Sequence, residues 1–340
     1  MVAIPKSLPQ MGLGMAALGR PGYINLNRGA IFDTIQGEND VQGRTVDIMQ
    51  NQANNVMDCL LKEASKRGMK PWFDCARSYG LSEKFVGNFL RNNNIKPDEV
   101  YVSSKWGYTY VADWKVTLEG ESPHEIKDHS TENFLKQIEE TIDEIGEYVD
   151  LYQVHSATFK SGVLSDSLLH EKLFDCKQKR GWAIGLSVSG PDQDEILREA
   201  MKIKSSDGKR LFDSVQCTFN MLEQRPSPAL LEAHEEGMDI IIKEGVANGR
   251  VFGSEKIRNF SDTTGYPVDQ LALACILAQP FHPRVLSGAV TSEQLISNLN
   301  AINISEKLKE GEHGMMGKMM KEAAISSEQY WKDRSNLSWN

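Results

Sequence analysis

Four polar residues of this chain stand where apolar runs end, and their side chains together suit the protonation of an oxygen atom. They are Asp74, Tyr79, Lys105 and His155. A free tyrosine has a pKa of about 10, which makes it a weak acid near neutrality. A nearby ammonium group lowers that pKa, and an aspartate paired with the lysine holds the ammonium in place. The residue types therefore predict that Lys105 and Asp74 tune Tyr79 as a general acid.

The histidine completes the set, because an imidazole N–H can donate a hydrogen bond to a carbonyl oxygen and orient it. Such a set protonates the alkoxide that forms when hydride reaches a carbonyl carbon. None of the four residues supplies hydride, so the chemistry implies a nicotinamide cofactor and a small carbonyl or alcohol substrate. Taken alone, each residue has a structural explanation. Asp74 would form a turn or cap, Lys105 would be a solvated charge at the rim, Tyr79 would pack in the core, and His155 would be a partly buried histidine with its hydrogen bonds satisfied. Their joint placement favours the chemical interpretation.

These residues follow strand candidates that are short and apolar on successive positions, which is typical of strands buried on both faces of a parallel sheet. Asp74, Lys105 and His155 end or directly follow three consecutive candidates, and adjacent strand ends share one rim. The expected strands are Met11–Leu18, Trp72–Asp74, Val100–Ser104, Val149–His155, Ala183–Ser187, Ser214–Cys217, Asp239–Lys243 and Val285–Ser287.

Helical periodicity fills the intervals between the strands. The expected helices are Asn54–Arg67, Leu81–Arg91 with Ser82 as its cap, Thr131–Gly146 capped by Thr131 or Ser130, Leu168–Arg180, Gln193–Ile203, Ser227–Glu236, Pro267–Gln279 and Ser292–Ala301. Eight strand–helix units favour an α/β fold, a closed (β/α)8 TIM barrel. The open doubly wound sheet is the alternative, but no Gly-x-Gly-x-x-Gly lies between a strand and a helix.

Length, charge and cysteine content indicate the domain organisation, the kinds of partner and the location of the protein. The 340 residues are expected to form a single barrel domain, with long loops near 25–51 and 106–128 and a tail from about 306. A net charge of −9 argues against nucleic-acid binding, and no apolar run or N-terminal apolar segment predicts a membrane partner or signal peptide. Five scattered cysteines predict neither disulfides nor a metal site, and they favour the cytoplasm. The oligomeric state is not indicated.

Across nearly its whole length the chain resembles the aldo-keto reductase family. The resemblance implies a barrel with NADP(H) extended across the rim and the same roles for the four polar residues. It also implies that Ser187 and Gln216 hydrogen-bond the nicotinamide carboxamide. The matching segments are Gly12–Met15, Phe73–Glu83, Val102–Lys105, Asp150–His155, Ile184–Ser187 and Val215–Asn220.

The resemblance further assigns the adenosine phosphate to the loop and helix start after the last strand. The expected contacts there are Ser287, Gly288, Thr291, Gln294 and Asn298. Some family members carry Lys and Arg where Gly288 and Gln294 stand, so we expect backbone N–H groups, the helix N-terminus and Lys243 or Arg250 to meet the 2′-phosphate. On this basis NADP(H) is expected over NAD(H).

Two further departures concern the nicotinamide end. Family members often have an aromatic residue that stacks on the nicotinamide ring, in a run like Tyr-Ser-Pro-Leu. The matching run here reads Lys243-Glu244-Gly245-Val246. Family members also often have an Asn directly after the serine of the fifth strand, and this position is Val188 here. The substrate wall is expected from 20–27, 106–128 and the tail. Two alternatives to a carbonyl reductase stay open: a cofactor-binding regulatory or channel-associated subunit, and the same enzyme working as a sugar or alcohol dehydrogenase.

Overall fold

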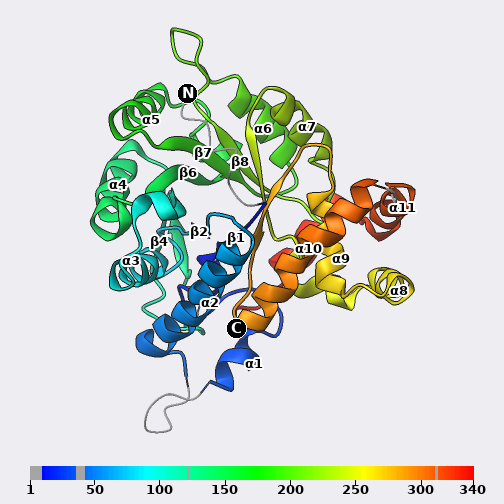
Figure 1. The fold of residues 1–340 in the computed structure, drawn as a ribbon. Helices are drawn as coiled ribbons and strands as arrows, with labels where there is room; N and C mark the ends of the chain where they lie inside the picture. Colours follow the sequence, from blue (N-terminus) through cyan, green and yellow to red (C-terminus); the bar gives the residue numbers. More distant parts are fainter. Residues whose placement is uncertain (1–9, 36–42, 121, 311–312) are drawn as a thin grey trace.

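The computed structural model describes residues 10–35, 43–120, 122–310 and 313–340. Eight parallel strands close into a barrel in the order β1-β10-β9-β8-β7-β6-β3-β2, with helices around it (Figure 1). The predicted (β/α)8 barrel is confirmed. The barrel strands are β1 (Met11–Gly14), β2 (Trp72–Asp74), β3 (Tyr101–Trp106), β6 (Val149–Ala157), β7 (Ala183–Val188), β8 (Ser214–Thr218), β9 (Asp239–Lys243) and β10 (Arg284–Ser287).

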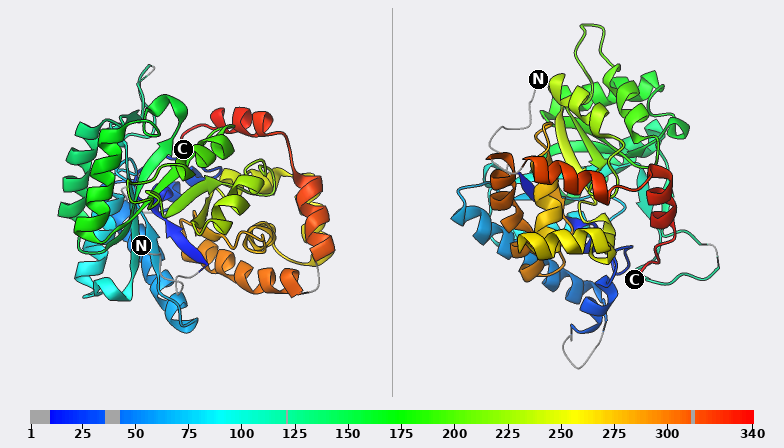
Figure 2. Two further views of the ribbon diagram at one scale, coloured as in Figure 1. Left: turned by 90° about the horizontal axis from the view of Figure 1, so that it is seen from above. Right: turned by 90° about the vertical axis from the view of Figure 1, so that its right-hand side faces the viewer.

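The helices cover the outer face of the barrel, and the tail helices lie beyond this ring (Figure 2). They are α1 (Arg28–Asp33), α2 (Val46–Lys66), α3 (Ser82–Asn92), α4 (Thr131–Ile145), α5 (Ser167–Arg180), α6 (Gln193–Met201), α7 (Ser227–Glu235), α8 (Glu255–Thr264), α9 (Val268–Leu277), α10 (Ser292–Glu310), α11 (His313–Ala323) and α12 (Ser327–Ser335). None of the helices in the described ranges is long and apolar enough to cross a membrane.

The first long loop is shorter than the sequence predicted. Helix α2 begins at Val46 rather than at Asn54, and Thr45 caps it by accepting a hydrogen bond from the Ile48 N–H. The added turns bury only Met49 and Ala53, so their polar outer face conceals the helical period. Residues 36–42 of this stretch lie outside the described residues.

The other two irregular segments also contain regular structure. The stretch 106–128 holds an antiparallel pair, β4 (Tyr108–Tyr110) and β5 (Glu125–Lys127). The expected tail is helical, because α10 continues to Glu310 and is followed by α11 and α12. Ser82 is inside α3 rather than its cap, and its hydroxyl donates to the Ala76 carbonyl.

The lower half of the barrel interior is filled by side chains. Trp72 is fully buried, and its indole N–H donates to the Ser103 hydroxyl at 2.9 Å. A Cβ on Gly12 would lie 2.5 Å from the Trp72 ring, so only glycine leaves room for it. This packing closes the barrel below the strand ends and leaves the upper rim for polar side chains.

Candidate active site

The upper rim brings together the four residues that the sequence singled out. Asp74 ends β2, Lys105 lies near the end of β3 and His155 near the end of β6, while Tyr79 follows β2 in the loop before α3. The Tyr79 ring lies 4.8 Å from the Lys105 Nζ and 5.4 Å from the His155 ring, measured from its centroid. Parallel strands with their ends on one rim produce this convergence.

The Asp74–Lys105 ion pair is enclosed by the barrel. Lys105 is fully buried, and its Nζ donates to Asp74 Oδ2 at 2.5 Å and to the Cys75 carbonyl at 2.9 Å. Asp74 Oδ1 accepts a hydrogen bond from Ser103 at 2.7 Å. A buried charge requires such partners, so the pair is a fixed floor beneath Tyr79.

Tyr79 differs from the expectation in its acidity. Burial raises the pKa of the Tyr79 phenol well above its usual range, and the Asp74 carboxylate adds to this, while Arg20 opposes it. The sequence argument considered only the ammonium, whereas desolvation of the phenolate dominates in the folded chain. The phenol therefore keeps its proton at neutral pH.

His155 is held as a neutral imidazole. Burial lowers its pKa well below the usual range, and Lys105 and Lys243 lower it further. Its Nδ1 lies 3.2 Å from the hydroxyl of Ser78, which is fully buried. The His129 Nε2 lies 2.7 Å from the His155 carbonyl oxygen and fixes this part of β6. Neither Ser78 nor His129 was assigned a role from the sequence.

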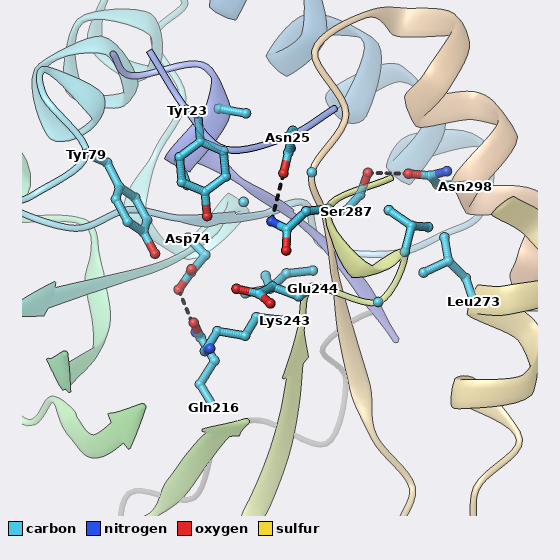
Figure 3. A pocket seen from close by; sticks show the side chains of 18 residues that line it. Tyr23, Asn25, Asp74, Tyr79, Gln216, Lys243, Glu244, Leu273, Ser287 and Asn298 are labelled. Atoms are coloured by element: carbon cyan, nitrogen blue, oxygen red, sulfur yellow. Dashed lines mark hydrogen bonds between the residues drawn. The ribbon is translucent and has the colours of Figure 1, made fainter. Parts of the chain in front are cut away.

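Three adjoining cavities form one groove across the rim. The central cavity is lined by Asp74, Tyr79, Gln216 and Lys243, and it runs into a distal cavity at Asn248, Gly288 and Asn298. A third, the tail cavity, lies beyond Tyr79 and is lined by Arg20, Glu125, His155, Arg334 and Trp339. In Figure 3 the Tyr23 and Tyr79 hydroxyls both point toward Asp74 in the central cavity.

The two residues expected at the nicotinamide lie side by side. Ser187 and Gln216 are register partners of β7 and β8. Gln216 lines the central cavity, and its Nε2 donates to Asp74 Oδ1 at 3.3 Å (Figure 3). Ser187 is fully buried, and its hydroxyl accepts the Ser156 N–H at 2.8 Å. Gln216 is therefore the more open of the two toward a ligand.

Lys243 and Glu244 occupy the position of the expected stacking run. The Lys243 Nζ donates to Ser189 and Thr218 at 2.8 and 2.6 Å, and burial lowers its pKa to about 8. Although burial alone would raise the pKa of Glu244, Arg334 and Lys243 hold it at about 2. The Arg334 pairing, at 2.6 Å, ties α12 to the end of β9.

Apolar side chains make up much of the distal cavity, and the polar side chains at its α10 end already have partners. Thr291 accepts the Gln294 N–H at 3.2 Å, and Gln294 Oε1 accepts the Val290 N–H at 2.9 Å. Asn298 accepts from the Ser287 hydroxyl at 2.7 Å (Figure 3) and donates to Asp269 at 2.9 Å.

Neither cation considered for the 2′-phosphate lies in this cavity. Lys243 faces the opposite end of the groove, and Arg250 donates to the carbonyls of Ala247 and Tyr330. Arg28 lines the distal cavity, but its guanidinium is engaged by backbone carbonyls, among them those of Ala17 and Pro21. The Lys243 and Arg250 side chains are held by other partners, and their expected contact with the phosphate stays a prediction.

The groove nevertheless fits a polar, elongated ligand. Asn248 is 3% exposed and lines both the central and distal cavities, yet its Oδ1 has no partner among the described residues. Gly288 offers open space, because a Cβ there would meet only the Asn25 side chain at 3.6 Å. The unpaired Asn248 oxygen, beside the uncovered backbone of Gly288, could accept a hydrogen bond from a ligand hydroxyl or amide.

The three segments expected to form the substrate wall all contribute to the rim, and they meet at the tail cavity. The tail cavity takes Arg20, Tyr23 and Ile24 from the first loop, Glu125 from β5 and Trp339 from the tail. The sequence did not single out Arg20, Glu125 or Arg334, because isolated charged residues carry no pattern that predicts their partners.

The comparisons with known proteins identify the family and the fold of the chain. The Aldo/keto reductase family model matches residues 37–319. An aldo-keto reductase of Gibberella moniliformis is 30% identical over 168 residues, which are 48% of this chain and 43% of that protein. The match thus spans less than half the length of that curated relative.

Two solved structures share the fold. A Pseudomonas aeruginosa protein assigned to the aldo-keto reductases has a TM-score of 0.59 at 19% identity, covering 87% of this chain and 91% of its own. An aldo-keto reductase from Bacillus halodurans in its holo form has a TM-score of 0.62 at 17% identity, covering 94% and 93%. At these identities the likeness concerns the fold.

Proposed function

Because the chain belongs to the aldo/keto reductase family, we propose that it reduces the carbonyl group of an aldehyde or ketone to an alcohol with a nicotinamide cofactor. The observation that carries the proposal is the convergence of Tyr79, His155 and the Asp74–Lys105 pair at one cavity. When bound, the cofactor supplies hydride to the carbonyl carbon.

The residues of the chain handle the proton and the carbonyl oxygen. Tyr79 keeps its proton until negative charge develops on the oxygen and then donates it. The Lys105 ammonium, fixed by Asp74, stabilises the phenolate that remains. A neutral His155 donates a hydrogen bond to the same oxygen and orients the carbonyl. In the reverse direction the same groups serve an alcohol dehydrogenase.

The cofactor is proposed to lie along the central and distal cavities. Gln216 and Asn248 would hold it there, Gln216 at the nicotinamide end. We propose NADP(H) over NAD(H) by a small margin, since the α10 N-terminus favours a phosphate while no lining cation of the described residues is free for it. Five free cysteines support a cytoplasmic location.

Replacing Tyr79 by Phe tests the proposal. Turnover should fall by roughly 10²–10⁴-fold, the usual size of a general acid contribution, while cofactor affinity stays nearly unchanged. Tyr148→Phe is the matched control, because its hydroxyl donates only to the Ile95 carbonyl outside the rim. A Tyr79→Phe enzyme with near-normal turnover would contradict the assignment, and cofactor binding without turnover of any carbonyl by the unmodified protein would favour a regulatory subunit.

A further inference from the structure

The tail cavity points to the chemical class of the substrate. Resting on the proposed function, we propose that this cavity takes a small carbonyl compound bearing hydroxyl groups in preference to an alkyl aldehyde of the same length. The cavity adjoins the Tyr79 and His155 side chains, so the part of a substrate beyond its carbonyl group would lie in it. Its wall therefore decides which substrates bind.

Arg20 provides unused hydrogen-bond donors in this wall. The side chain is 3% exposed, and its guanidinium lies 4.7 Å from the Trp339 ring centroid and 5.4 Å from that of Tyr79. One nitrogen donates to the Ser78 carbonyl and to Glu125, each at 2.9 Å. The buried Nε has no partner within the described part of the chain. A buried N–H without an acceptor is costly, and a ligand oxygen would satisfy it.

The same wall provides acceptors. Glu125 uses Oε2 for Arg20, and its other oxygen forms no hydrogen bond with the described residues, although the side chain is only 28% exposed. The Ser156 and Ser189 hydroxyls lie 3.4 Å apart and also face the cavity. A substrate hydroxyl group both donates and accepts hydrogen bonds, so it matches a wall that contains both donors and acceptors. An alkyl chain would leave these groups desolvated and unpaired.

The charges of the cavity argue against an anionic substrate. Arg20 is paired with Glu125 at 2.9 Å and Arg334 with Glu244 at 2.6 Å. Lys243 is held by two hydroxyl groups. A substrate carboxylate would meet two guanidinium groups that already have carboxylate partners, and it would lie close to the Glu125 carboxylate. Neutral hydroxyl groups meet no such repulsion.

The test compares two aldehydes with the same three-carbon skeleton and one short aldehyde that carries a carboxylate. We expect kcat/KM for glyceraldehyde to exceed that for propanal by at least about tenfold, the worth of one or two hydrogen bonds in the transition state. Equal or better turnover of propanal would overturn the inference while leaving the proposed function intact. Preference for 4-oxobutanoate over both would assign the cavity to anions instead. Turnover of none of the three would contradict the proposed function itself.

Two variants tie the preference to this wall. Glu125→Ala removes the open acceptor on β5, and Arg20→Lys keeps the charge but removes Nε. Each should cut the glyceraldehyde-to-propanal ratio of kcat/KM by about fivefold or more. Glu119→Ala, at an exposed position between β4 and β5, is the control. If Arg20→Lys fails to fold, Glu125→Ala alone decides, and an equal effect of Glu125→Ala and Glu119→Ala would overturn the inference.

Discussion

At the scale of single residues, the candidate site is organised by buried polar contacts around the Asp74 carboxylate. It binds the Lys105 ammonium and the Ser103 hydroxyl at 2.5 and 2.7 Å, and the Gln216 amide at 3.3 Å. One carboxylate thus links the expected acid–base group to a residue expected to contact the cofactor. Removing either partner of the ion pair would leave a buried charge unpaired, which commonly costs about 3–5 kcal/mol.

Ser78 is expected to set the proton position on His155. A neutral imidazole carries one proton, and a Ser78 hydroxyl that donates to Nδ1 leaves that proton on Nε2, free for a carbonyl oxygen. Ser78→Ala should therefore lower kcat by about tenfold, with cofactor affinity unchanged. The ¹⁵N chemical shifts of His155 should show loss of a single tautomer.

The control for this variant is Ser305→Ala, which removes a fully buried serine hydroxyl that donates to the Ile302 carbonyl in α10. Ser78→Cys, which keeps a weak donor, should recover part of the activity. Unaltered ¹⁵N shifts in Ser78→Ala, or an equal loss of kcat in Ser305→Ala, would mean that Ser78 only packs.

The sequence identified residues at strand ends but not their partners. Asp74, Lys105 and His155 were predictable because apolar runs end at them. Ser78 and Arg20 were not, because their contacts with His155 and Glu125 join segments 77 and 105 residues apart. The direction of the Tyr79 pKa was missed for the same reason, since burial is a property of the folded chain.

At the scale of elements, the strands were easier to predict than the helices that cover the groove. Strands β2 and β9 begin and end as expected, because they are continuous apolar runs. Helix α12 buries only Ser327 and Tyr330, so the sequence has no apolar stripe there that would predict a helix. Arg334 holds it to Glu244, which lies in the left-handed region with φ of 55°. This ion pair, together with the hydrogen bonds of Ser327 to Glu223 and of Asn220 to Tyr330, positions α12 beside the tail cavity.

The start of α10 carries the prediction on cofactor choice. Gln294 lies in its first turn, and its side chain accepts the Val290 N–H rather than pointing a charge at a ligand. Gln294→Arg should free that N–H and add a charge-assisted contact, tightening NADPH by about 1–2 kcal/mol and leaving NADH nearly unchanged. Fluorescence titration of both cofactors measures the two affinities.

An exposed position further along α10 serves as the control for this variant. Ile296→Arg adds the same charge at a side chain that is 40% exposed and outside the lining of the distal cavity. If Gln294→Arg strengthens NADH as much as NADPH, or Ile296→Arg has the same effect, this helix start does not read the 2′-phosphate.

At the scale of the whole molecule, the pH dependence of stability should reflect buried groups whose charged forms are disfavoured in the fold. Burial lowers the pKa of His129 to about 4, and it raises the pKa of Asp150 to about 6. His129 is neutral in the fold but protonates readily once unfolded, so its contribution is fully present above pH 6.5 and is lost as pH falls toward 4. Asp150 acts in the opposite sense, because the fold favours its protonated form, so its penalty decreases as pH falls below about 6 and is gone below 3.8.

Denaturant unfolding between pH 7 and 4.5 should separate these two contributions. The unmodified protein should lose free energy of unfolding as pH falls, and His129→Gln should lose about 2 kcal/mol less, since it no longer takes up a proton on unfolding. Asp150→Asn should lose about 1–2 kcal/mol more, because the Asp150 compensation is gone while an amide oxygen still accepts the Val102 N–H. Parallel curves for the three proteins would mean that neither group sets the acid stability. A shallower slope for His129→Gln would assign part of the acid sensitivity to the residue that contacts the His155 carbonyl, and a steeper slope for Asp150→Asn would show that Asp150 opposes it.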